Sequence, residues 1–205
     1  MQTTRQKMKR RAEETQWRGG WLRWAHACPS PNCEARPALA CIDLIVVHSI
    51  SLPPGEYGGD AVAALFLNRL AWDAHPYYAQ IRGLRVSSHF FITRAGKAWQ
   101  FVDIHQRAWH AGVSSYRGRA QCNDDSVGIE LEGLEGQPFE AAQYATLEHL
   151  CDALRRVLPI RYVAGHEHIA PGRKADPGAA FDWMRLSVHL AGSGLMLPPL
   201  TQHTR

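Results

Sequence analysis

The order of apolar and polar residues predicts two strands near the middle of a sheet. The run "CIDLIVVH" at 41–48 is apolar and β-branched almost throughout, which is typical of a strand buried on both faces. The run "SVGIELEG" at 126–133 alternates instead, with apolar residues from Val127 onward on one face. Glu130 and Glu132 fall on the other face, which we therefore expect to be polar.

Shorter apolar runs predict the rest of the sheet. Residues 86–92 and 98–102 are separated by a turn around Gly96, which favours a hairpin. The segment "RYVAG" predicts a last short strand at 161–164. A hairpin beside strands that are separated by helices indicates a mixed sheet.

Helical periodicity is clearest from Pro138 to Leu158, and Pro159 ends it. The predicted buried stripe of this helix is Leu147, Leu150, Cys151, Leu154 and Val157. A short helix capped by Asp60 and a final amphipathic helix in "FDWMRLSVHL" complete the pattern. Strands interleaved with helices predict an α+β fold, a mixed central β-sheet flanked by helices in a single domain.

Composition and charge set the domain limits. A chain of 205 residues that is 45% hydrophobic can bury one sizeable core. The net charge of +4 is uneven, because residues 1–23 hold seven Lys and Arg against two Glu. We therefore expect a disordered basic tail at 1–19, the folded domain at 20–190 and a flexible C-terminal tail at 191–205.

The cysteines and the hydropathy favour a cytoplasmic protein. Five cysteines are scattered along the chain, so we expect reduced thiols. Cys28 and Cys33 could form half of a metal site, but no second close pair accompanies them. The chain shows neither a secretory signal nor an apolar run long enough to span a bilayer, so we expect no membrane partner and no nucleic-acid partner.

Candidate metal ligands lie at the ends of two predicted strands. His48 closes the first strand, and "GHEHIAPGRKADPG" follows the last one. Strand ends of a helix-covered sheet open into a shared crevice, and imidazoles and carboxylates are good zinc ligands. Asp176 could return as a third ligand, since the Pro and Gly between it and His166 allow the chain to fold back. The spacing leaves His166 and His168 as alternatives for the second ligand. A simpler interpretation is that these histidines lie in exposed polar loops and bind no metal.

Longer motifs indicate a family. In order, "VVHSISLPPGEYGG", "LRVSSHFFI", "RAWHAGVSSYRGR", "CNDDSVGIELEG" and "GHEHIAPGRKADPGAAFDW" closely resemble the AmpD-type 1,6-anhydro-N-acetylmuramoyl-L-alanine amidases. These are zinc enzymes with the amidase-2 and peptidoglycan-recognition fold. The resemblance implies that His48, His166 and Asp176 bind Zn²⁺, that Glu130 is the proton acceptor, and that Lys174 stabilises the transition state.

The chemistry of amide hydrolysis agrees with these implied roles. Zinc lowers the pKa of bound water to about 7, a carboxylate can move the proton, and a cation can stabilise the developing oxyanion. Without the resemblance, we would interpret Glu130 as an exposed residue of a strand and Lys174 as a solvated surface lysine.

The resemblance also implies which residues contact the substrate. A sugar-peptide needs an aromatic platform and cations, and the motifs supply Arg85, Trp109, His110 and Asn123. Ser49 and Gln121 depart from the family pattern, where Asn and Arg are usual, and both changes fall where the resemblance implies substrate contacts.

The resulting expectation is a monomeric zinc amidase that cuts small anhydro-muropeptides between muramic acid and L-alanine during cell-wall recycling. Three alternatives remain: an amidase acting on intact peptidoglycan, a recognition domain that binds peptidoglycan without cleaving it, and a hydrolase using Cys122 or Cys151 as nucleophile. The last lacks a motif and places Cys151 on a buried helix face.

Overall fold

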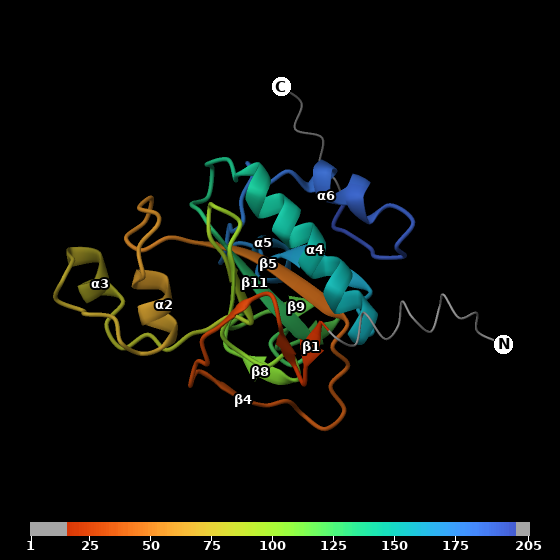
Figure 1. The fold of residues 1–205 in the computed structure, drawn as a ribbon, viewed down its shortest axis with the longest axis horizontal. Helices are drawn as coiled ribbons and strands as arrows, with labels where there is room; N and C mark the ends of the chain where they lie inside the picture. Colours follow the sequence, from red (N-terminus) through yellow and green to blue (C-terminus); the bar gives the residue numbers. More distant parts are fainter. Residues whose placement is uncertain (1–15, 200–205) are drawn as a thin grey trace.

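The structure, a computed structural model, describes residues 16–199. Its centre is a six-stranded sheet with the order β12-β5-β11-β6-β7-β3; β5 and β11 are labelled in Figure 1. The strands are β12 (Tyr162–Gly165), β5 (Leu44–Ile50), β11 (Ser126–Glu132), β6 (Phe90–Ile92), β7 (Ala98–Gln100) and β3 (His26–Ala27). The first four are parallel, whereas β6 and β7 form the predicted antiparallel hairpin. The predicted mixed sheet is confirmed.

The long predicted helix is α4 (Ala141–Val157), which lies across one face of the sheet (Figure 1). At its start the backbone N–H of Glu140 donates to Gln143 Oε1, 3.0 Å away, and the helix ends two residues before Pro159. Its buried stripe includes the predicted Leu147, Leu150, Cys151 and Leu154. Val157, the last helical residue, is 40% exposed, so the stripe ends one turn earlier than predicted.

The two central strands separate the core from the side that carries polar residues. On β5, Ile45 and Val47 pack into the cluster that contains the α4 stripe, whereas Leu44 and Val46 pack into a cluster on the opposite face. The apolar residues of β11 all join the α4 cluster. Since side chains alternate along a strand, Glu130 points to the opposite face of the sheet, as predicted.

The glutamates on that face are nevertheless buried. Glu130 is 9% exposed and Glu132 is 4% exposed, so the alternative reading of Glu130 as an exposed strand residue does not hold. Glu132 accepts the backbone N–H groups of Gly58 and Arg94. Loops that the strand pattern does not reveal therefore cover this face.

Short elements surround the sheet. The remaining helices are α2 (Ala61–Phe66), α3 (Pro76–Gln80), α5 (His166–Ile169) and α6 (Trp183–Leu190). The remaining strands pair as β1 (Trp17–Arg18) with β2 (Trp21–Leu22), β4 (Cys33–Ala35) with β8 (Gln106–Ala108), and β9 (Ser115–Tyr116) with β10 (Arg119–Ala120). α2 and α3 are set off to one side of the sheet (Figure 1). Asp60 precedes α2 without a side-chain capping bond, contrary to expectation.

The folded domain is wider than the predicted range 20–190. Trp17 is buried in the main core, and at the other end Met196 forms a bridge with Tyr162 while Leu195 and Leu197 pack on the same core. The domain thus includes residues 16–19 and 191–199, because their apolar side chains cover core surface. The rest of both predicted tails lies outside the described residues.

All five cysteines are free thiols. No helix among residues 16–199 is long and apolar enough to cross a membrane.

Candidate active site

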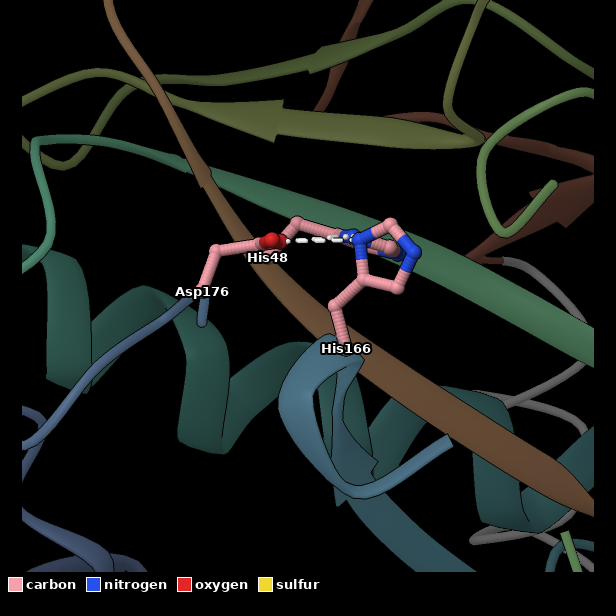
Figure 2. A group of neighbouring side chains, drawn as sticks. All are labelled: His48, His166 and Asp176. Atoms are coloured by element: carbon pink, nitrogen blue, oxygen red, sulfur yellow. Dashed lines mark hydrogen bonds and ion pairs between the residues drawn. The ribbon is translucent and has the colours of Figure 1, made fainter. Parts of the chain in front are cut away.

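The three predicted metal ligands lie together because parallel neighbouring strands end at the same edge of the sheet. His48 lies on β5, and His166 directly follows β12, whose Gly165 is paired with Val47 of β5. The loop after α5 then brings Asp176 back to this edge. Figure 2 shows the three side chains pointing toward one another.

The ligand atoms form a nearly equilateral triangle. His48 Nδ1 lies 2.9 Å from His166 Nδ1, and each of these nitrogens lies 3.0 Å from Asp176 Oδ2. Ligands about 2.0–2.2 Å from a tetrahedral zinc lie about 3.3–3.5 Å apart. The triangle therefore needs to widen by only a few tenths of an ångström to hold such an ion. It is the one group of potential metal ligands of this kind among residues 16–199.

Burial and hydrogen bonding suit these groups to metal binding. His48, His166 and Asp176 are at most 5% exposed. Burial lowers the pKa of His48 to about 4, so its imidazole is neutral near pH 7. Burial alone would raise the pKa of Asp176, but the adjacent His166 and His48 rings hold it below its usual value, so it is a carboxylate. Two imidazoles and one carboxylate are a ligand set that zinc accepts.

The cluster contains His166 and not His168. The ring nitrogen Nδ1 of His168 accepts the backbone N–H of Gly165 at 3.0 Å, and its ring packs edge-on against Trp183. The second histidine of the H-x-H pair thus supports the start of α5.

Glu130 lies beside the cluster with an unsatisfied oxygen. It is the direct neighbour of His48 across the β5–β11 pair, and its Oε2 is buried without a hydrogen-bond partner. Burial, helped by the charge of Asp176, raises the pKa of Glu130 well above its usual value. A carboxyl group in this state is suited to taking up and releasing a proton.

A cavity of about 470 Å³ opens next to these groups. His48, His166, Asp176, Glu130 and the exposed Lys174 line its polar part. The apolar part is lined by residues of the α2–α3 region and nearby loops: Leu52, Pro54, Leu65, Phe66, Tyr77, Ile81, Leu84, Val86 and Leu134. None of these apolar residues was predicted to line a substrate site: Leu65, Phe66 and Tyr77 lie on the short helices α2 and α3, and the others lie in loops.

The four predicted substrate contacts are distributed differently. His110 lines the cavity, whereas Arg85, Trp109 and Asn123 do not. Arg85 is exposed between two lining residues, and the Trp109 indole donates to Glu34 Oε1 at 3.0 Å. Asn123 is 6% exposed, and its Oδ1 accepts backbone N–H groups within the protein.

The two residues that depart from the family pattern also differ in their position relative to the cavity. Ser49 lines the cavity, whereas Gln121 does not.

Cys122 and Cys151 are poor nucleophiles. Burial raises the pKa of Cys151 to about 12 and also raises that of Cys122. Since the thiolate is the reactive form, neither side chain supports the cysteine-hydrolase alternative.

Comparisons with known proteins identify the family of the chain. Residues 37–179 match the family model described as N-acetylmuramoyl-L-alanine amidase. The 1,6-anhydro-N-acetylmuramyl-L-alanine amidase AmpD of Escherichia coli is 49% identical over 171 residues, covering 82% of this chain and 93% of the relative. The enzyme of the same name from Citrobacter freundii is 50% identical over 168 residues, covering 81% and 90%.

Solved structures show the same fold. A crystal structure of a selenomethionine derivative of AmpD aligns with a TM-score of 0.81 at 48% identity, covering 84% of this chain and 97% of that one. The E. coli amidase AmiD, solved with anhydro-N-acetylmuramic acid-L-Ala-D-γ-Glu-L-Lys, aligns with a TM-score of 0.54 at 29% identity, covering 75% and 60%.

Proposed function

The chain belongs to the N-acetylmuramoyl-L-alanine amidase family, and from this we propose that it hydrolyses the amide between 1,6-anhydro-N-acetylmuramic acid and the L-alanine of the stem peptide. The observation that carries the proposal is the meeting of three buried ligand atoms with a partnerless glutamate oxygen beside one cavity. A recognition domain that only binds would have no use for this combination.

We propose that His48, His166 and Asp176 hold one Zn²⁺. When bound, zinc lowers the pKa of a coordinated water and polarises the substrate carbonyl. The protein contributes two imidazoles and a carboxylate whose ligand atoms are already within 3.0 Å of one another. Little reorganisation is then needed to form the site.

Glu130 moves the proton in this proposal. Its free Oε2 accepts a proton from the attacking water, and its burial keeps that proton bound long enough to be delivered to the departing L-alanine nitrogen. The C–N bond breaks as this nitrogen becomes an amine. Protonation of the leaving group matters because an amide anion leaves very poorly.

Lys174 stabilises the charge that develops on the carbonyl oxygen. It lines the cavity beside Asp176, and a positioned cation of this kind favours the transition state over the planar amide.

The cavity suits a muropeptide. Its apolar side can receive the sugar ring, and its polar side places the scissile amide near the ligand cluster. We keep Arg85 and Trp109 as predicted contacts for parts of the stem peptide that extend beyond the cavity, where the Arg85 cation can pair with a carboxylate. Two expectations stay predictions: that the protein is a monomer, and that it works in the cytoplasm on recycled wall fragments.

Product analysis tests the proposal. Purified protein is incubated with an anhydro-muropeptide and, in parallel, with intact sacculi, and the products are identified by mass spectrometry. We expect release of free stem peptide from the muropeptide, loss of this release with a chelator, and recovery on adding Zn²⁺. Faster release from sacculi would favour the wall-cleaving alternative, and binding without release would favour the recognition domain.

A further inference from the structure

The outer nitrogens of both histidine ligands are bonded to one short segment. His48 Nε2 lies 2.9 Å from His110 Nδ1, and His166 Nε2 lies 3.0 Å from the carbonyl oxygen of Ala111. His110 and Ala111 are consecutive residues, so a single dipeptide contacts both imidazoles on the side opposite the ligand triangle.

The direction of these hydrogen bonds follows from their end points. The Ser126 hydroxyl donates to the carbonyl of Cys122, which can only accept. Ser126 Oγ is then the acceptor for His110 Nε2, 3.2 Å away. A neutral imidazole has one N–H and one lone pair, so His110 Nδ1 accepts from His48 Nε2–H. The Ala111 carbonyl can only accept, so His166 Nε2 donates to it, and in both ligands Nδ1 is the ring nitrogen that faces the triangle.

The dipeptide is itself held in place. Asn123 Oδ1 accepts the backbone N–H of His110 at 3.1 Å and that of Ala111 at 2.8 Å. A Cβ on Gly128 would lie 2.5 Å from the Cγ of His110, so a glycine is needed where this ring lies on the sheet. The Arg173 guanidinium also donates to the Ala111 carbonyl, at 2.7 Å.

We propose that His110 and Asn123 are positioning residues, which fix the tautomer and orientation of the two histidine ligands, rather than residues that recognise the substrate. This inference rests on the metal site proposed above. Groups that accept from the outer N–H of a metal-bound histidine typically change metal affinity when they are removed. The family resemblance predicts substrate binding for both residues, so the two roles give different results.

Two substitutions at His110 separate the roles. His110→Phe keeps a ring of similar shape and removes the acceptor, whereas His110→Asn places an amide oxygen near the position of Nδ1. We expect the zinc dissociation constant, measured by competition with a chromophoric chelator, to rise about 10–100-fold in His110→Phe and to stay within about 3-fold of the parent in His110→Asn. The visible spectrum of the Co²⁺-substituted protein should change in His110→Phe alone.

A second pair of variants tests the positioning role of Asn123, which holds the His110–Ala111 segment. Asn123→Ala removes the acceptor of both backbone N–H groups, and Asn123→Asp keeps it. Zinc affinity should fall in Asn123→Ala and recover in Asn123→Asp.

Controls distinguish positioning from general loss of stability. His89 is fully buried and stacks edge-on against His110, but it bonds Gly128 and Gln106 and neither ligand. His89→Phe should lower the melting temperature of the chelator-treated protein and leave the zinc affinity unchanged. If His110→Phe binds zinc as tightly as the parent and instead raises KM, His110 is a substrate contact and the inference is wrong. If the parent itself binds no zinc, the proposed function fails first.

Discussion

Two sides of one cavity differ in how their polar atoms are satisfied. On the ligand side, each ring nitrogen of His48 and His166 faces either the ligand triangle or a partner behind it. On the neighbouring strand, Glu130 Oε2 is buried with no partner. The ligand side is therefore organised to keep a fixed geometry, whereas the Glu130 side holds an oxygen without a partner, as the proposed proton transfer requires.

The same contrast appears within β11. Glu130 and Glu132 share a face of the strand and are both buried. The two oxygens of Glu132 accept N–H groups from loops that pack over it, whereas no such loop reaches Glu130 Oε2. Burial without a partner is costly, which supports the proposed proton-transfer role of Glu130, whereas Glu132 has a structural role.

Removing a ligand should have the largest effect. Asp176→Ala deletes one corner of the triangle, so we expect loss of bound zinc and activity no greater than that of an enzyme-free control. Elemental analysis and a turnover assay on the same sample check this. Full activity in the variant would contradict the metal site.

Glu130→Gln should come next. It removes proton transfer but no ligand, so kcat should fall about 10²–10⁴-fold while zinc content stays at the parent level. Steady-state kinetics with metal analysis measures both, and a loss of zinc would place Glu130 among the ligands.

Lys174→Ala should be somewhat less damaging. Loss of one group that stabilises an oxyanion typically lowers kcat about 10²–10³-fold. Because the interaction develops in the transition state, kcat should fall more than KM rises. An effect confined to KM would make Lys174 a substrate-binding residue.

Glu132→Gln addresses stability rather than rate. The amide turns an N–H donor toward one of the two backbone N–H groups that Glu132 accepts, which should cost about 1–3 kcal/mol of unfolding free energy. Urea denaturation measures this. An unchanged midpoint would show that the two bonds contribute little.

The smallest effect should be a pH-dependent gain in stability. Because burial raises the pKa of Glu130, the folded metal-free protein retains a proton that the unfolded chain releases as pH rises above the ordinary glutamate pKa. Its stability then falls between that pKa and the raised one. Glu130→Gln should therefore raise the melting temperature in chelator near pH 7 and not at about pH 4. A rise in melting temperature that is the same at both pH values would contradict the explanation by the raised pKa of Glu130.

The sequence predicted the strands and the helix that follow a regular hydrophobic period, but it did not predict the contacts that the loops make. The apolar runs of β5 and β11 and the stripe of α4 follow strand and helix periods, and the ends of β5 and β12 placed His48 and His166 at one edge. The cover over Glu132 comes from loops without periodicity. Asn123 illustrates the same limit, because only the three-dimensional structure reveals that its oxygen bonds the segment behind the ligands.

The most direct test compares zinc content and turnover in three proteins side by side: the parent, Asp176→Ala and Glu130→Gln. The account predicts about one zinc per chain with activity in the parent, neither in Asp176→Ala, and zinc without appreciable activity in Glu130→Gln. Equal activity in all three, or zinc lost from Glu130→Gln and kept by Asp176→Ala, would contradict the division between a ligand side and a proton-transfer side.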